Sequence, residues 1–113
     1  MGLEGTLAPL ASCLSLEILE LRYCQQLTGG LDPLTSCRFL ETLSLAGCKK
    51  LTGTLAALAS CASLDTLLIY NSGIRGSLEH LRLCPLVSLN VRLCAITGVD
   101  EFKRSHPGCS VSA

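Results

Sequence analysis

Residues 40–53 read LETLSLAGCKKLTG, and this stretch decides the fold because the chain repeats it. The same spacing of apolar positions occurs at residues 16–29, LEILELRYCQQLTG. Shorter copies follow at residues 64–76, LDTLLIYNSGIRG, and at residues 86–98, LVSLNVRLCAITG. Self-similarity at a fixed period of this length is typical of solenoid proteins, in which each unit buries its apolar face against the next.

Each copy has two halves with different periodicities. In the first half, Leu alternates with mostly polar residues, which predicts a short β-strand. The second half has the three-residue spacing Leu-x-x-Leu-x-x-Cys, which predicts one or two helical turns, and the Ala-rich residues 55–62 are the best helix former of the set. The chain therefore divides into a half-repeat at 5–15, repeats at 16–39, 40–63, 64–85 and 86–105, and a C-terminal cap at about 97–113, all within one domain, 1–113.

The expected cap carries its own start and stop signals. Thr97-x-x-Asp100 resembles a capping box, and Pro107-Gly108 ends the helix. The tail at 109–112 is predicted to add a short edge strand that covers the last repeat. The front has no comparable cap, so we considered a missing upstream portion, a self-association surface or a marginal module, and favour a fragment of a longer array.

The motif L-x-x-L-x-L-x-x-C-x-x-L-T-G resembles the leucine-rich-repeat family, and the resemblance covers residues 5 to 105. It implies an α/β solenoid, with a short parallel β-sheet on the concave face and short helices or turns on the convex face. It also implies that the position held by Cys24, Cys48 and Cys94 points inward. Members of this family commonly act by binding other proteins, which we expect here.

The eight cysteines follow the phase of the repeat. Cys13, Cys37, Cys61 and Cys84 share one position, and Cys24, Cys48 and Cys94 share another. Stacked strands lie about 4.8 Å apart, whereas the Cβ atoms of a disulfide lie about 3.8 Å apart, so neighbours fit poorly as bridges. We expect reduced, structural thiols. A zinc site is not expected, because His106-x-x-Cys109 lacks two further ligands.

Composition and motifs exclude several classes of function. Nine Lys and Arg balance nine Asp and Glu, which gives no electrostatic reason for a nucleic acid or an anionic membrane as partner. The apolar runs are far shorter than the roughly 18 residues of a membrane span, and the start does not read as a secretory signal, so we expect a cytoplasmic protein. There is no nucleophile elbow, phosphate loop or His-Glu-x-x-His motif, which predicts no enzyme and no cofactor.

One processing motif is present at the start. Met1-Gly2-x-x-x-Thr6 fits the N-myristoylation pattern. However, residues 5–8 match residues 53–56 of the repeat, so Thr6 already has a structural explanation. We therefore expect no lipid anchor.

Outward positions of stacked strands form columns across the concave sheet, and these columns are the candidate binding surface. The position after the first Leu is acidic in three repeats, and the position after the last strand Leu carries Arg, Ala, Tyr and Arg. Tyr and Arg are enriched at interface hot spots. The candidate residues for binding a protein partner are Glu17, Glu20, Arg22, Tyr23, Glu41, Asp65, Tyr70, Asn71, Asn90 and Arg92.

Two alternatives remain open. The chain could be the recognition segment of a larger leucine-rich-repeat signalling protein such as a receptor-like kinase, because its L-T-G-x-L turns are similar to plant-type receptor repeats. Those units carry Asn where this chain has Cys24 and Cys48, and their G-x-I-P motif is absent. A purely structural repeat spacer is the other alternative.

Overall fold

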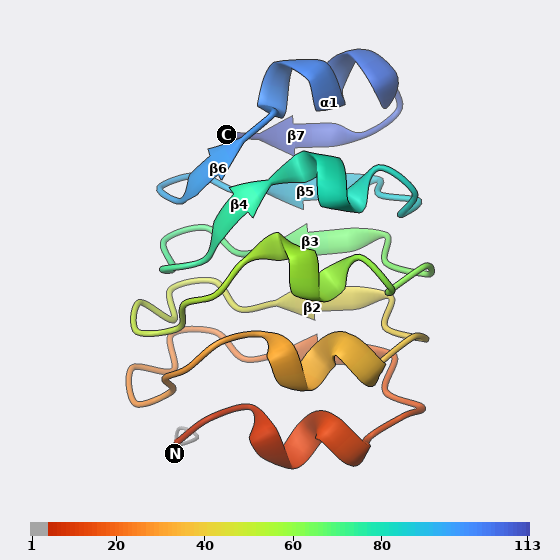
Figure 1. Cartoon of the computed structure of the whole chain (residues 1–113). Helices are drawn as coiled ribbons and strands as arrows, with labels where there is room; N and C mark the ends of the chain where they lie inside the picture. Colours follow the sequence, from red (N-terminus) through yellow and green to blue (C-terminus); the bar gives the residue numbers. More distant parts are fainter. Residues whose placement is uncertain (1–4) are drawn as a thin grey trace.

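The computed structural model describes residues 5–113. The Met1-Gly2 start of the myristoylation motif lies outside the described residues. The chain winds through successive rungs, each with a short strand on one side and a short helical segment on the other (Figure 1). No helix in the described part of the chain is long and apolar enough to cross a membrane.

The predicted strands form one parallel sheet in the order β1-β2-β3-β5-β7. The inward-facing Leu19, Leu43, Leu67 and Leu89 lie in register, and Val111 of the last strand continues the row. The repeat spacing predicted this register, and the structure confirms it. The strands are β1 (Ile18–Glu20), β2 (Thr42–Ser44), β3 (Thr66–Leu68), β5 (Ser88–Asn90) and β7 (Ser110–Ser112).

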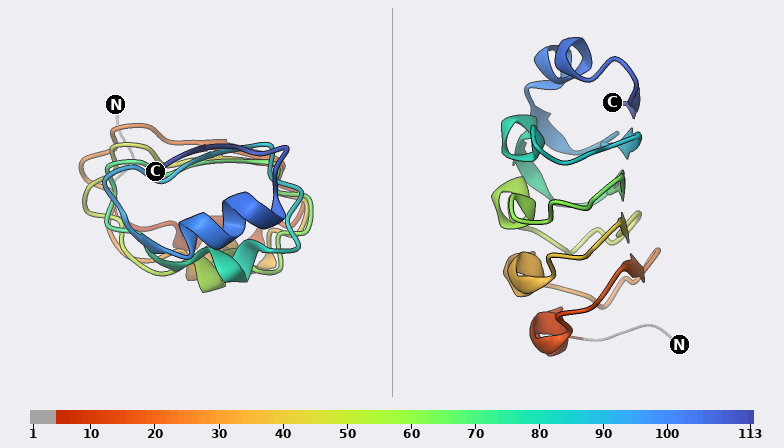
Figure 2. Two further views of the ribbon diagram at one scale, coloured as in Figure 1. Left: turned by 90° about the horizontal axis from the view of Figure 1, so that it is seen from above. Right: turned by 90° about the vertical axis from the view of Figure 1, so that its right-hand side faces the viewer.

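The opposite side is built from short 3-10 helices rather than α-helical turns. They are η1 (Ala8–Ser12), η2 (Asp32–Ser36), η3 (Leu55–Leu58) and η4 (Leu78–Leu81). Strands stack about 4.8 Å apart, whereas packed α-helices need about 8–10 Å, so a slim 3-10 turn fits the rung better. Successive helical segments nevertheless lie farther apart than successive strands, which makes the strand face concave (Figure 2). The constraint also explains why Ala-rich η3 is no longer than its neighbours.

The L-T-G segments, which we had interpreted only as turns, form a second parallel ladder. Its regular part is β4 (Arg75–Ser77) paired with β6 (Ala95–Thr97). In the earlier rungs single bridges continue it, and the Thr52 amide and hydroxyl both donate to the carbonyl of Gly29, at 2.8 and 3.3 Å. The glycine of each motif has a positive φ, for example +86° at Gly29, a conformation that other residues rarely adopt.

The C-terminal cap differs from its prediction in one respect. Helix α1 (Val99–Ser105) is present, and β7 covers β5 as an edge strand, as expected. The capping box was wrong, because the residue before the helix is Gly98 in a left-handed conformation and no side chain caps the helix. The Thr97 hydroxyl instead donates to the carbonyl of Gly76, at 3.5 Å, as part of the second ladder.

The core is a set of aliphatic rows between the two sides. Leu43, Leu55 and Leu67 are fully buried, and the Leu, Ile and Cys residues at equivalent positions join them in one cluster. Phe102 of α1 is the one aromatic side chain buried among the described residues, and it closes the C-terminal end of the cluster. The core is therefore built from aliphatic rows, in agreement with the low aromatic content of the sequence.

Replacing a row residue tests this packing directly. Leu43→Ala removes a fully buried side chain, and we expect it to lower the free energy of unfolding by about 2–5 kcal/mol. Leu83→Ala is the matched control, because Leu83 is 80% exposed and should change stability by less than about 0.5 kcal/mol. Urea denaturation followed by circular dichroism measures both. Equal losses in the two variants would contradict the packing described here.

Candidate functional site

The concave face of the sheet carries outward side chains from each strand. Leu19 is buried while its neighbours Ile18 and Glu20 are exposed, so these two positions define the face. The sequence interpretation chose Glu20 and Asn90 from this pattern but missed the column that starts at Ile18. The missed column consists of Ile18, Thr42, Thr66 and Ser88. Each of these residues directly precedes a buried Leu, so period-two alternation around that Leu was the signal that could have predicted the column.

The acidic residues at the strand starts lie at the edge of this face. Glu17 and Glu41 are exposed, whereas Asp65 is half-buried and its Oδ1 accepts a hydrogen bond of 2.9 Å from the Thr66 hydroxyl. Their backbone carbonyls also accept hydrogen bonds from backbone amides at the start of the next strand, so each rung contributes one residue to the column. They form a column as predicted, but each side chain precedes its strand rather than standing on it.

Glu20 and Arg22 are brought together at the first rung. Arg22 Nη2 lies 3.7 Å from Glu20 Oε2, and both side chains are about half exposed, at 51% and 54%. An exposed pair of this kind contributes little to stability, on the order of 0–1 kcal/mol. Its effect is to hold two candidate binding residues at the open end of the sheet.

Tyr23 and Tyr70 meet across three rungs. The Tyr23 ring occupies the space above Gly47 where a side chain would otherwise lie. A hydrogen bond with the Tyr70 side chain is the main cause of a raised pKa at Tyr23, and repulsion between the two phenolates adds to it. Ala46 is fully buried, so the predicted column of Arg22, Ala46, Tyr70 and Arg92 is not exposed along its whole length.

The last rungs hold the remaining candidates. The Asn90 side chain Oδ1 accepts a hydrogen bond of 3.2 Å from the Arg92 amide, which fixes the turn after β5. Asn71 has a positive φ of 57° at the position where Tyr23, Gly47 and Leu93 also have positive φ. Asn71 therefore has a conformational role, and the Arg92 side chain is exposed.

One buried polar group lies within the face. Ser44 is fully buried on the outward side of β2, and within residues 5–113 its Oγ has no hydrogen-bond partner. Its column neighbours are the larger Glu20 and Leu68, as the strand register shows. The second rung thus has small residues on the concave side, Ser44, Ala46 and Gly47, beneath larger side chains from the rungs on either side.

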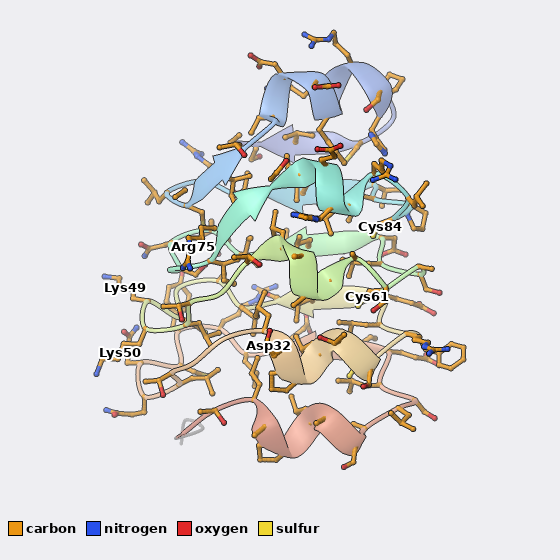
Figure 3. The ribbon with its side chains drawn as sticks, in the orientation of Figure 1. Asp32, Lys49, Lys50, Cys61, Arg75 and Cys84 are labelled. Atoms are coloured by element: carbon orange, nitrogen blue, oxygen red, sulfur yellow. The ribbon has the colours of Figure 1, made fainter. Side chains whose placement is uncertain are left out.

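The buried cysteines donate hydrogen bonds to backbone carbonyls of the preceding rung. Cys61 and Cys84 come from neighbouring rungs (Figure 3), and the Cys84 thiol donates to the carbonyl of Cys61 at 3.4 Å. Burial raises the pKa of Cys61 to about 11, so the thiol stays protonated near neutral pH. Within the described residues no group of three or more His, Cys, Asp or Glu is placed to hold a metal ion.

A shallow groove of about 460 Å³ lies away from the concave face, between η4 and α1. His106 lines it, with Nε2 3.1 Å from the carbonyl of Arg82 and Nδ1 2.9 Å from the Ser105 hydroxyl. Its ring stacks on Phe102 with centroids 4.0 Å apart. These contacts account for His106 as part of the cap, as its sequence position predicted.

Together these features define a class: the protein is a repeat solenoid of short parallel strands alternating with 3-10 turns, with a leucine-rich-repeat-like arrangement. No protein-family model matches the chain, and no curated protein sequence matches it.

The Cys61 thiol gives the fold a dependence on alkaline pH. Its pKa rises from 9.0 to about 11 on folding, so its contribution to stability is fully present below pH 9 and is lost as the pH rises toward 11. We expect the free energy of unfolding to fall over this window more steeply in the wild type than in Cys61→Ala. Urea denaturation at a series of pH values measures the two slopes, and equal slopes would contradict the assignment.

The tyrosine pair can be tested because the chain has only two tyrosines. We expect Tyr70→Phe to lower the pKa of Tyr23 toward 10.0, because the variant removes the hydroxyl that raises it. Titration followed by NMR of tyrosine labelled at Cζ resolves Tyr23 in both proteins. An unchanged pKa at Tyr23 would show that the two hydroxyls do not meet in solution.

Proposed function

We propose that the chain is a leucine-rich-repeat protein and a non-catalytic interaction module that binds a polypeptide through its concave strand face. The observation that carries this proposal is the position of the Tyr23 ring over Gly47, whose amide donates to the carbonyl of Tyr70 in the next rung. Two tyrosines from different rungs lie just beyond the ends of β1 and β3, beside the open sheet face, with Arg22 and Arg92 at the position of Tyr70 in the first and last repeats.

The backbone beneath the pair is rigid, which favours binding. Tyr23 N donates to the carbonyl of Ala46 at 2.8 Å, and Gly47 N donates to the carbonyl of Tyr70 at 2.9 Å, so three consecutive rungs are tied together. Residues held in this way lose little conformational entropy when a partner binds. Tyr and Arg on a preorganised surface are the usual anchors of a protein interface.

The rest of the face suits a polypeptide more than a small molecule. Its side chains are a mixture of hydroxyls, amides, charges and exposed apolar groups such as Ile18, which is 60% exposed. The concave sheet offers an extended surface of this kind, whereas small ligands are usually enclosed in a cavity. This contrast supports a macromolecular partner.

The thiols favour a reducing compartment. Cys37, Cys48, Cys61 and Cys84 are buried, and Cys48 donates to the carbonyl of Leu21 at 2.8 Å. Thiols that serve as packing groups and donors persist where glutathione keeps them reduced. We therefore place the module in the cytoplasm as part of the same proposal.

A photocrosslinking experiment tests the concave face. Benzoylphenylalanine replaces Leu68, a half-buried residue at the middle of the face, which leaves both tyrosines in place. We expect crosslinked adducts with a defined protein from the source cells. Excess unlabelled wild type should compete with them, whereas a Tyr23→Ala/Tyr70→Ala double variant should compete on the order of tenfold to a hundredfold less well.

The control places the same crosslinker at Glu79, an exposed residue of η4 on the convex side. The proposal requires that adducts form from position 68 and not from position 79. The same adducts from both positions, or competition by the double variant equal to that by the wild type, would rule out the concave face. No adduct from either position would favour the structural spacer.

A further inference from the structure

The charges of this neutral chain are segregated by their phase in the repeat. The strand-end turns, defined as residues 22–28, 46–52, 70–75 and 92–97, follow the last strand position of each repeat. They contain five of the nine Lys and Arg residues and no Asp or Glu. The five cations are Arg22, Lys49, Lys50, Arg75 and Arg92.

The fold gathers these turns along one edge. Lys49, Lys50 and Arg75 lie at the same edge of the solenoid in consecutive rungs (Figure 3). All three side chains are exposed. Within residues 5–113 the one ion pair joins Arg22 to Glu20, so the other four cations of the edge have no acidic partner in the described part of the chain.

The positions directly before the strands have the opposite sign. Glu17, Glu41 and Asp65 stand at the strand starts, one in each of three rungs. Arg22 lies five positions after Glu17, which is about 16 Å of extended chain. The concave face is therefore bounded by an acidic edge where the strands begin and a basic edge where they end.

We propose that the strand-end turns bind an acidic segment of a polypeptide partner. The inference rests on the proposed function, because it names the chemistry of the partner and the side from which it approaches. Tyr23 and Tyr70 belong to the same strand-end turns, so a segment rich in Asp or Glu would reach the basic side chains while the tyrosines contact its apolar residues. The acidic strand starts would repel the same segment and so fix its position on the face.

The same features argue against a nucleic acid. Double-stranded DNA carries one charge per about 1.7 Å of its axis, so its phosphates would also run past the acidic edge. A net charge of +0 gives no long-range attraction to offset that repulsion. A short acidic peptide can avoid the acidic edge, whereas a duplex spans both edges.

The test uses fluorescent poly-L-glutamate as the probe, with an uncharged peptide of equal length as reference. We expect the wild-type protein to bind poly-L-glutamate with an affinity that falls as salt is added, because the cations are exposed. Lys49→Glu/Lys50→Glu/Arg75→Glu should weaken the affinity by about tenfold or more, and the three changes to Gln should weaken it less. Fluorescence anisotropy measures all of them, and circular dichroism checks that each variant is folded.

A matched control is Arg38→Glu/Lys103→Glu/Arg104→Glu, which changes the net charge equally at exposed positions outside the strand-end turns. It should retain binding within about threefold. Equal losses in the two triple variants, or no binding of poly-L-glutamate by the wild type, would overturn the inference.

Tighter binding to single-stranded DNA or to phosphatidylserine vesicles, lost with the Lys49, Lys50 and Arg75 changes, would overturn it in favour of those ligands. Crosslinks from position 68 without poly-L-glutamate binding would leave the proposed function standing and reject this inference alone.

Discussion

Backbone hydrogen bonding between rungs is the constraint on which this structure depends. A strand of three residues has no pairing partner in its own rung, so its amides and carbonyls must be satisfied by the rungs before and after it. The Leu21 amide, for example, donates to the carbonyl of Ser44 at 2.8 Å, and the Leu45 amide donates to that of Leu68 at 2.9 Å. The second ladder, through the L-T-G segments, imposes the same register at the far end of each strand-end turn.

Two ladders in one register leave few places where the repeat can change its length. The third repeat is shorter than the second, and one of its missing residues falls in the strand-end turn, where Gly73 stands in place of Lys49 and Lys50. The shortened turn runs close to the previous rung, because a Cβ at Gly73 would lie 2.5 Å from the carbonyl oxygen of Leu51. Glycine is the residue that permits this approach. The length of a turn can therefore vary, whereas the length of a strand cannot.

The periodicity of the sequence predicts the features that all repeats share. It fails where contacts with a neighbouring rung decide the local structure. The strands, their register and the buried Leu rows follow from the spacing of apolar residues, and the edge strand β7 follows from the tail. The second ladder was missed because Leu51-Thr52-Gly53 shows no alternation that distinguishes a paired segment from a turn. The capping box failed because Thr97 is the last residue of β6 in that ladder and Gly98, which follows it, has a φ of +78°. In both cases a contact with the previous rung overrode the local signal.

The candidate site shows the same limit more sharply. Reading columns of equivalent positions places Tyr70 in line with Arg22 and Arg92, but it does not pair Tyr70 with Tyr23, which occupies the next position two rungs away. That contact depends on Gly47, whose missing side chain leaves room for the ring. Residues at equivalent positions of the repeat could be exposed together, but the sizes of the residues in the intervening rung decide which side chains come into contact.

In a repeat protein of this kind, charges have to be summed over equivalent positions of the repeats and not over the whole chain. Over the whole chain the net charge is +0, which gives no electrostatic reason for a nucleic acid or an anionic membrane as partner. Rungs lie about 4.8 Å apart, within the roughly 8 Å over which charges interact at physiological salt, so residues of one phase act together. The acidic and basic edges are about 16 Å apart and are screened from each other. A partner approaching the strand-end turns therefore meets a local positive field that the neutral composition conceals.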